Sequence, residues 1–216
     1  MSDMVVSDII IIDDHPMLRK GLIQLLELEV DFNPVAECGD GKQAVELAQQ
    51  YEPDLILLDL NMPGFSGIDT LKALRAADID ARILMFTVSD AQEDVVEAFK
   101  WGADGYLLKD MEPEQIVEQL RQALTGQMAI SPELTNILAS AIRHKSTIHK
   151  ANINDLTSRE KQVLKLIAAG QSNKLIARKL KISEGTVKVH VKRVLSKLNM
   201  KSRVEAAVWL VENRIS

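Results

Sequence analysis

Cysteine is almost absent from this chain, and aromatic residues are scarce. Cys38 is its single cysteine, and Phe, Trp and Tyr together make up 4% of the residues. One cysteine excludes an internal disulfide framework and any zinc cluster built on several cysteines. No apolar run approaches the roughly 18 residues that a membrane span requires, and Met1–Asp8 lacks the basic segment of a signal peptide. We therefore expect a cytoplasmic protein with no membrane contact.

Basic residues are scarce early in the chain, and acidic residues are scarce late in it. Residues 1–130 hold 9 Lys and Arg against 25 Asp and Glu, whereas residues 154–216 hold 14 against 5. Such asymmetry is typical of a nucleic-acid-binding module joined to a module of another kind. Charge alone leaves open the alternative of two ordinary domains with unequal isoelectric points.

Short apolar runs alternate with helical periods through the first half of the chain. The runs are Ile9–Ile12, Pro34–Cys38, Leu55–Leu58, Ile83–Thr87 and Tyr106–Leu108. Three of them are continuously apolar, as in parallel strands buried on both faces. Amphipathic stretches lie between them, and we expect Asp90 and Glu93 to open one of these as a capping pair. Five βα repeats predict a doubly wound α/β domain, flavodoxin-like, with a five-stranded parallel sheet over residues 8–126.

The rest of the chain shows only helical periods. Residues 127–153 are interpreted as a linker that carries one amphipathic helix. Thr157 and Glu160 have the spacing of a capping box at the start of the next helix. A short helix, a tight turn and a longer helix capped by Ser183 follow. Residues 154–216 are therefore predicted to form a small all-α domain.

Polar residues gather where the predicted strands end, which is where parallel α/β domains bind ligands. Asp13 and Asp14 follow the first strand, Asp59 follows the third, Thr87 ends the fourth and Lys109 follows the fifth. Three converging carboxylates repel one another without a cation, so we expect Mg²⁺ among them. Such an ion and a lysine would neutralise a phosphoryl group in transfer to a carboxylate.

Four segments carry a family resemblance. IIIIDDHPMLRKG, DLILLDLNMPGFSG, FTVSD and GADGYLLKD resemble the signature blocks of bacterial response-regulator receiver domains, over about residues 8–126. The resemblance implies that a sensor histidine kinase phosphorylates Asp59. It also implies that Thr87 and Tyr106 form a switch pair and that Lys109 binds the phosphoryl group.

The same resemblance implies the ligands of the metal ion. Asp14, Asp59 and the backbone carbonyl of Asn61 would bind Mg²⁺, and Asp13 would assist through water. A phosphohydrolase that uses Asp59 as its nucleophile is an alternative of another class. Such an enzyme needs a second acid/base carboxylate nearby, and Asn61 stands two residues after Asp59. We therefore expect no enzyme beyond the chain's own phosphoryl transfer and dephosphorylation.

The helix from Glu184 to Asn199 is predicted to be the DNA-reading element. Its valines and leucines share one face, and Lys188, Val189 and Lys192 fall on or near the opposite face. A short helix, a tight turn and a basic second helix fit a helix-turn-helix, whose second helix enters the major groove. Lysines can reach phosphates or guanine edges there, and a valine can contact a thymine methyl. A solvated basic helix in a small bundle is the alternative that spacing leaves open.

A second resemblance concerns the basic domain. LTSREKQVLKLIAAGQSNKLIARKLKISEGTVKVHVKRVLSKL resembles the LuxR/FixJ-type helix-turn-helix, over about residues 154–214. It implies four helices, recognition of double-stranded DNA by the third and homodimer contacts through the fourth. Further residues expected at the DNA are Ser172, Asn173, Lys174 and Thr186.

Taken end to end, the chain resembles nitrate/nitrite response regulators of the NarL and NarP type. DDHPMLR, ILLDLNMPG, DGYLLKDMEPE, TVKVHVK and KSRVEAAVW carry this resemblance. It implies a transcription regulator that phosphorylation switches and that controls nitrate/nitrite-responsive genes. The same architecture responding to another signal is one alternative, and a phosphorelay sink without DNA binding is another, which the basic domain disfavours. We also expect the acidic domain to cover the basic helix until Asp59 is phosphorylated.

Overall fold

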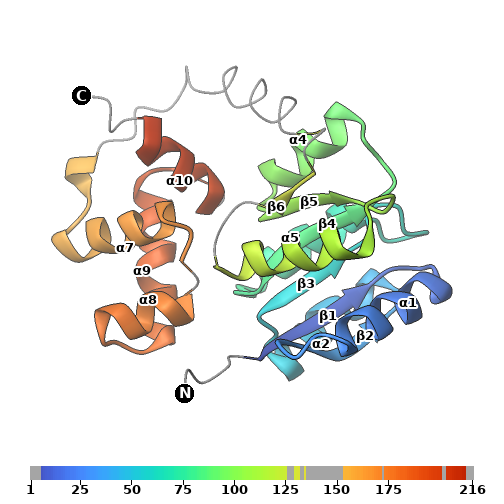
Figure 1. Ribbon diagram of the computed structural model, residues 1–216. Coiled ribbons are helices and arrows are strands. Elements are labelled where there is room, and N and C mark those ends of the chain that lie inside the picture. The colour runs from blue at the N-terminus through green and yellow to red at the C-terminus, as the bar shows by residue number, and fades with distance from the viewer. Residues whose placement is uncertain are drawn as a thin grey trace.

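The computed structural model describes residues 6–125, 129–131, 134, 153–171, 173–200 and 203–212. These residues form two bodies that lie side by side, an α/β body and a smaller helical body (Figure 1). The helix predicted within residues 127–153 lies outside the described residues, apart from Leu134 in a short turn.

The α/β body is built on a parallel sheet in the order β2-β1-β3-β4-β5-β6. The strands are β1 (Ser7–Ile12), β2 (Phe32–Cys38), β3 (Leu55–Leu58), β4 (Arg82–Thr87), β5 (Gly105–Leu108) and β6 (Ala129–Ile130). The doubly wound fold and its five predicted strands are confirmed. The sixth strand is only two residues long, which is too short for a hydrophobic pattern in the sequence to predict it. It pairs with β5 through Gly105 and Ala129, where a Cβ on Gly105 would lie 2.3 Å from the Ala129 carbonyl oxygen.

Helices cover both faces of the sheet. They are α1 (Pro16–Glu27), α2 (Ala44–Tyr51), α3 (Gly67–Ala76), α4 (Gln92–Lys100) and α5 (Pro113–Thr125). One core packs α2, α3 and α4 against Ile10, Ile56 and Met85. The other packs α1 and α5 against the alternate residues Ile9 and Leu57. Successive strand residues face opposite sides of the sheet. Because helices cover both sides, every residue of β3 and β4 is buried, and the segments Leu55–Leu58 and Ile83–Phe86 are continuously apolar.

The start of α4 differs from the prediction. Ala91, not Asp90, is its N-cap residue, and no side chain caps it, so the expected capping pair of Asp90 and Glu93 is wrong. Ser89 accepts a hydrogen bond from the Ala91 backbone at 3.3 Å and donates to Asp94 at 2.5 Å. The serine one residue earlier therefore organises this turn.

The helical body contains α7 (Ser158–Ala168), α8 (Asn173–Leu180), α9 (Glu184–Lys197) and α10 (Arg203–Glu212). The capping box of Thr157 and Glu160 is confirmed. Ser183 caps α9 and accepts a hydrogen bond from the Thr186 backbone at 3.1 Å. Lys181 has φ of 54°, a left-handed conformation that closes the tight turn between α8 and α9.

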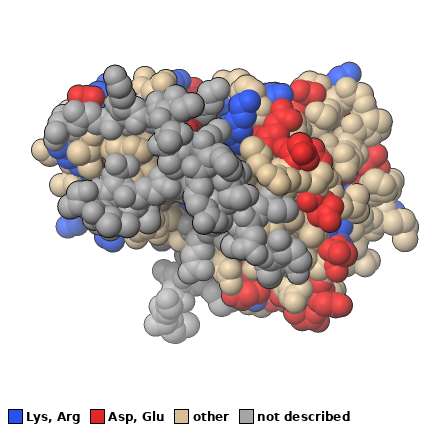
Figure 2. Space-filling model, turned by 90° about the horizontal axis from the view of Figure 1, so that it is seen from above, with Lys and Arg blue, Asp and Glu red and all other residues tan. Residues whose placement is uncertain are grey.

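The two bodies differ in charge as the sequence predicts. Acidic side chains predominate over the α/β body and basic side chains over the helical body (Figure 2). Within the described residues, no helix is both long and apolar enough to cross a membrane.

Candidate functional site

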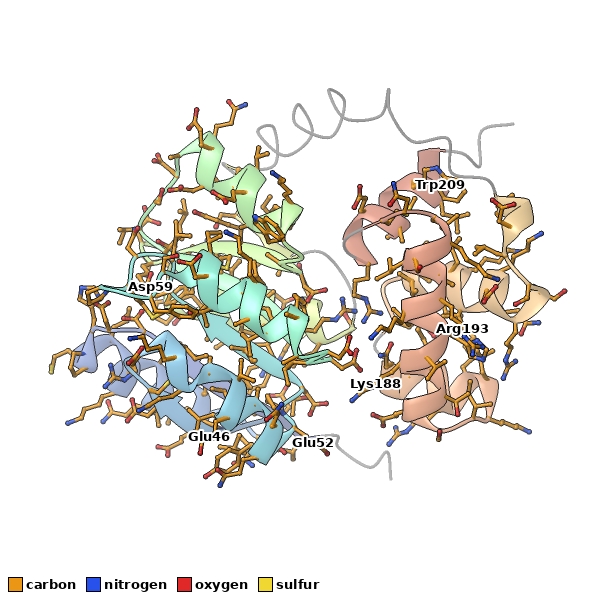
Figure 3. All side chains as sticks on the ribbon, turned by 180° about the vertical axis from the view of Figure 1, so that it is seen from behind. Glu46, Glu52, Asp59, Lys188, Arg193 and Trp209 are labelled. Carbon is orange, nitrogen blue, oxygen red and sulfur yellow. The ribbon has the colours of Figure 1, made fainter. Side chains whose placement is uncertain are left out.

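The carboxyl ends of the strands bring the predicted acidic residues together. Ile12 pairs with Leu58 in the parallel register of β1 and β3, so the residues that follow each strand are neighbours. The Asp59 backbone N–H donates to the Ile12 carbonyl at 2.8 Å. Asp13 and Asp59 are 1% and 2% exposed. Asp59 lies at the end of the α/β body farther from the helical body (Figure 3).

Lys109 joins the two buried aspartates. Its ammonium lies 2.6 Å from Asp13 Oδ2 and 3.0 Å from Asp59 Oδ2. A single positive charge thus faces two buried carboxylates, with Asp14 beside them. The net charge of the cluster is therefore negative. A buried charge of this kind requires a further positive partner.

Several buried oxygens of the cluster have no hydrogen-bond partner among the described residues, and Lys109 or His15 lies near all of them except Asp59 Oδ1. Asp59 Oδ1 is buried and has no hydrogen-bond partner among the described residues. Carboxylate oxygens of Asp13, Asp14 and Asp59 and a ring nitrogen of His15 all lie within 4.8 Å of one another. The oxygens suit a hard divalent cation such as Mg²⁺. His15 directly follows the acidic pair in the sequence, but no motif or spacing marked it as a site residue.

Thr87 and Tyr106 meet at the loop that leaves β4. The buried Thr87 hydroxyl accepts a hydrogen bond from the Ser89 backbone at 3.3 Å and lies 3.5 Å from Asn61 Nδ2. The Tyr106 hydroxyl donates to the Ser89 carbonyl at 3.0 Å. Burial raises the pKa of Tyr106 well above its usual value, so the hydroxyl keeps its proton. Both side chains therefore hold the same segment around Ser89.

The predicted DNA-reading face of α9 is polar and exposed. Thr186, Lys188, Val189 and Lys192 are exposed, whereas Val187 and Val194 are fully buried. In Figure 3, Lys188 lies on the side of α9 that faces the α/β body, and Arg193 lies on the other side. The structure therefore places part of this basic face beside the acidic body, with its lysine side chains still exposed to solvent. Ser172 and the side chain of Lys174 lie outside the described residues.

The turn between α3 and β4 contacts this basic face. Asp78 Oδ2 lies 2.9 Å from the Lys192 ammonium. Asp80 Oδ1 accepts a hydrogen bond from Asn173 Nδ2 at 2.5 Å. Asn173 is only 3% exposed. A side chain predicted to contact DNA is therefore buried and hydrogen-bonded to a carboxylate of the other body. Burial, only partly offset by the charges of Arg203 and Lys188, raises the pKa of Asp80.

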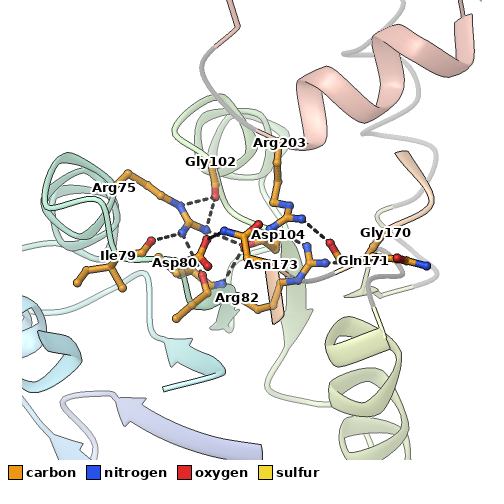
Figure 4. A network of polar contacts seen from close by, with 12 residues as sticks. Arg75, Ile79, Asp80, Arg82, Gly102, Asp104, Gly170, Gln171, Asn173 and Arg203 are labelled. Carbon is orange, nitrogen blue, oxygen red and sulfur yellow. Dashed lines mark hydrogen bonds and ion pairs between the residues drawn. The ribbon is translucent and has the colours of Figure 1, made fainter. Parts of the chain in front are cut away.

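Arginines complete the contact between the bodies (Figure 4). Arg82 Nη2 donates to the Gly170 carbonyl at 2.6 Å, at the end of α7. Arg82 and Arg75 also bind the buried Asp104 at 3.0 and 2.6 Å. Burial and the nearby charge of Arg82 lower the pKa of Arg203 to about 10. Arg82, the first residue of β4, therefore links the sheet to the helical body.

Residues 9–121 match the family described as "Response regulator receiver domain", and residues 154–210 match "Bacterial regulatory proteins, luxR family". The chain is 53% identical over 215 residues to the nitrate/nitrite response regulator protein NarL of Escherichia coli (strain K12), with 100% of each chain covered. It is 46% identical over 206 residues to NarP of the same strain, with 95% of each covered.

Solved structures of response regulators are similar to most or nearly all of the chain. Response regulator ChrA of a heme-sensing two-component system is 32% identical, with a TM-score of 0.52 and 98% of this chain and 99% of that one covered. A LuxR-family two-component response regulator from Aurantimonas sp. SI85-9A1 is 33% identical, with a TM-score of 0.60, covering 64% of this chain and 99% of that one. The chain belongs to the two-component response regulators, phosphorylation-dependent transcription regulators that join a receiver domain to a luxR-family DNA-binding domain.

Proposed function

We propose that a sensor histidine kinase phosphorylates Asp59 and that the chain then controls nitrate/nitrite-responsive genes. The observation that carries the first part is the buried Asp59 carboxylate, which has one oxygen free of hydrogen-bond partners and the other facing Lys109. The likeness to NarL and NarP along the whole chain supports the nitrate/nitrite signal. The alternative is the same architecture with another signal.

Magnesium would serve this phosphoryl transfer. In our proposal the carboxylates of Asp14 and Asp59 and the carbonyl of Asn61 hold Mg²⁺, and Asp13 assists through water. The ion would offset the negative balance of the cluster and neutralise phosphoryl oxygens. Lys109, already between Asp13 and Asp59, would neutralise another oxygen. The chain's chemistry is limited to taking up and losing its own phosphoryl group.

Thr87 and Tyr106 would convert phosphorylation into a movement. The Thr87 hydroxyl binds the Ser89 backbone, and Tyr106 binds the Ser89 carbonyl. A phosphoryl oxygen on Asp59 would carry negative charge and would accept a stronger hydrogen bond than a neutral oxygen does. It would therefore draw the Thr87 hydroxyl toward it as a donor. Because Ser89 shares contacts with both side chains, moving Thr87 would release the segment before α4 and allow Tyr106 to repack.

The contact between the two bodies would keep the unphosphorylated chain off DNA. Asp78 pairs with Lys192, and Asp80 accepts a hydrogen bond from Asn173. Both partners are residues expected at the DNA. Phosphorylation adds negative charge to the receiver, which alone would strengthen its attraction to the basic body. Opening must therefore come from the rearrangement around Ser89 and not from charge.

After opening, two chains would bind DNA together. Pairing through α10 would place two α9 helices on successive half-sites of double-stranded DNA, and a homodimer binds far more tightly than one domain. The working parts would be a receiver over residues 8–126, a linker over 127–153 and a DNA-binding domain over 154–216. The protein would act in the cytoplasm, where bacterial DNA lies.

Phosphorylation can be tested directly. The chain is incubated with acetyl phosphate and Mg²⁺, the acyl phosphate is trapped with borohydride, and the labelled peptide is mapped. We expect the label on Asp59, and its loss in Asp59→Asn and after chelation of Mg²⁺. Label on Asp13 or Asp14 would contradict the assignment.

The signal requires a separate experiment. Genome-wide DNA occupancy is compared in cells grown with and without nitrate. We expect nitrate to raise occupancy at a defined set of promoters in the wild type and not in Asp59→Asn. DNA occupancy that does not change with nitrate but still depends on Asp59 would favour another signal.

A further inference from the structure

The contact of Asn173 with Asp80, where the two bodies meet, leaves one buried oxygen without a hydrogen-bond donor (Figure 4). Asn173, at the start of α8, donates from Nδ2 to Asp80 Oδ1 at 2.5 Å. Its own amide oxygen, Oδ1, is buried and has no hydrogen-bond partner among the described residues. A buried acceptor without a donor costs free energy. A hydrogen on a neighbouring group would therefore stabilise this contact.

Asp80 in turn lacks a close positive partner, although it is partly buried. The charged groups around it come from both bodies and are Arg75, Asp78, Arg82, Asp104, Glu184, Lys188 and Arg203. Arg75 and Arg82 bind Asp104. Arg203 donates to a carbonyl in the turn after α7 at 2.6 Å. Among the described residues no ion pair involves Asp80, so a negative charge there would be poorly compensated.

A proton on Asp80 would correct both deficits. A neutral carboxyl has an O–H donor as well as acceptor oxygens, and a carboxamide has donors and an acceptor. The Asn173 amide could then donate to one carboxyl oxygen and accept from the other, which closes a ring of two hydrogen bonds. Turning the amide over would place its oxygen against Asp80 Oδ1, and two oxygens that close also require a proton between them. Burial, which outweighs the charges of Arg203 and Lys188, raises the pKa of Asp80 in the same direction.

We propose that Asp80 carries a proton when the two bodies are in contact and shares it with Asn173, so that acid strengthens the closed arrangement. This proton site exists only in the closed arrangement, because Asp80 belongs to one body and Asn173 to the other. In an open arrangement, water would surround Asp80 and its pKa would return to the usual 3.8.

The direction of the pH dependence follows from these two pKa values. The closed form binds the proton more tightly than the open form, so the added stability is fully present below the pKa of the open form. It is lost as the pH rises through the raised pKa of the closed form. The inference rests on the proposed function only in taking the closed arrangement to be the one that cannot bind DNA.

Protonation is measured first, on the unphosphorylated full chain without DNA. The side-chain carboxyl carbon of Asp80 is followed by ¹³C NMR from about pH 4 to pH 8, and its signal is identified by its absence in Asp80→Asn. We expect a midpoint above 3.8 and a lower midpoint in Asn173→Ala, which cannot share the proton. If Asn173 only donated to a charged carboxylate, its removal would instead raise the midpoint. That result, or a wild-type midpoint at or below 3.8, would overturn the inference.

Closure is measured by energy transfer between dyes on the two bodies. The dyes are attached through Lys20→Cys on α1 and Arg193→Cys on α9, both exposed positions, in a Cys38→Ala background. Lys192→Ala, which lacks the exposed ion pair between the bodies, is added to raise the population of the open form. We expect transfer to fall as the pH rises. The ratio of closed to open chains should decrease by up to about tenfold per pH unit between the two pKa values of Asp80.

Two variants that both remove the charge of Asp80 separate a shared proton from simple electrostatics. An asparagine at position 80 can form both hydrogen bonds with Asn173 without a proton, whereas an alanine can form neither. Asp80→Asn should therefore stay closed at every pH, and Asp80→Ala should be more open and equally indifferent to pH. Glu46→Gln, on α2 away from the helical body (Figure 3), is the control and should keep the wild-type profile. Identical behaviour of Asp80→Asn and Asp80→Ala would overturn the inference, as would a wild-type profile that matches Asp80→Asn.

The consequence for DNA is measured last, by gel shifts of the unphosphorylated full chain. We expect the affinity of the wild type, relative to Asp80→Ala at the same pH, to fall as the pH is lowered. A constant ratio, with closure that still follows pH, would count against inhibition by the receiver and hence against the proposed function. The NMR midpoints and the energy transfer would still decide whether Asp80 shares a proton with Asn173.

Discussion

At the residue scale, Gly67 shapes the loop that presents Asp59. A Cβ at this position would lie 2.0 Å from the Asp59 carbonyl oxygen and 2.6 Å from Leu60 Cα. The Gly67 N–H also donates to the Leu60 carbonyl at 2.8 Å. The first turn of α3 is therefore pressed against the backbone of the phosphoacceptor loop, and only a residue without a side chain allows this approach.

We expect Gly67→Ala to destabilise the receiver by about 1–3 kcal/mol, because backbone atoms must move to admit the methyl group. Gly21→Ala is the control, since a Cβ there meets nothing within 4 Å and alanine stabilises a helix interior by roughly 0.5–1 kcal/mol. Urea unfolding is followed by the fluorescence of Trp101 in a Trp209→Phe background. Gly67→Ala as stable as the wild type would contradict the packing argument.

Glu160 links two elements of the DNA-binding domain. Its carboxylate accepts a hydrogen bond from the Thr157 backbone at 2.7 Å and lies 2.7 Å from the Lys197 ammonium of α9. The hydrogen bond from Lys197, with that from Thr157, lowers the pKa of Glu160 from 4.5 to about 2. A lowered pKa in the folded state adds stability above the unfolded value, and this stability is lost as the pH falls through the folded value.

Glu160→Gln should therefore lower the free energy of unfolding near neutral pH by about 1–2 kcal/mol. The difference from the wild type should shrink as the pH falls from about 4.5 toward 2, the window between the two pKa values. Unfolding is followed through Trp209 in a Trp101→Phe background. A difference that stays constant across this window would show that the charge of Glu160 does not contribute.

At the scale of elements, α9 combines a buried face and a basic face. Val187 and Val194 are fully buried in two cores of the helical body, which fixes the rotation of the helix. That rotation turns Lys188 and Lys192, one helical turn apart, toward the same side. The packing of the valines thus decides which lysines can reach DNA.

Lys188→Ala and Lys192→Ala should each weaken DNA binding by the phosphorylated chain. A lysine that reads a base should contribute roughly 1–3 kcal/mol of discrimination at one position. A lysine that contacts phosphate should weaken all sequences alike and reduce the salt slope by about one. Arg193→Ala is the matched control, since Arg193 lies on the other side of α9 (Figure 3). If neither lysine variant changes affinity or salt slope, α9 is not the reading helix.

At the scale of the whole molecule, the two bodies meet through contacts of unequal strength. The Lys192 and Asp78 side chains are 72% and 71% exposed, and an exposed ion pair contributes only about 0–1 kcal/mol. The contacts of Asp80 with Asn173 and of Arg82 with Gly170 are more buried and cost more to break without replacement. A few such contacts can be opened by a modest rearrangement in the receiver.

Residues 150–216 alone should bind one DNA site more tightly than the unphosphorylated full chain. In the full chain, Asp78→Asn with Asp80→Ala should raise affinity toward that of the fragment. Asn tolerates the positive φ of 56° at position 78. Glu46→Gln, on α2 away from the helical body (Figure 3), is the charge-matched control for one carboxylate. Gel shifts measure all four proteins, and equal affinity of fragment and full chain would show that the receiver does not inhibit.

Local patterns in the sequence were sufficient for most of the fold and for the acidic cluster. Continuous apolar runs indicated β1, β3 and β4, because strands buried on both faces need apolar residues at every position. Parallel strands place their carboxyl ends at one edge, so the residues after each run had to converge. The capping box of Thr157 and Glu160 is likewise local, since it depends on three residues of spacing.

Specific contacts of the folded chain, both local and long-range, decided the rest. The two-residue β6 exists only because it pairs with β5, and the N-terminus of α4 is organised by Ser89 and Asp94 and not by Asp90. His15 Nδ1 lies 2.8 Å from Asp14 Oδ1 at the acidic cluster, although its side chain is 65% exposed. Asn173, expected at DNA, is buried against Asp80. The sequence by itself determined which residues carry charge and where the strands end, whereas only tertiary packing determined which opposite charges meet.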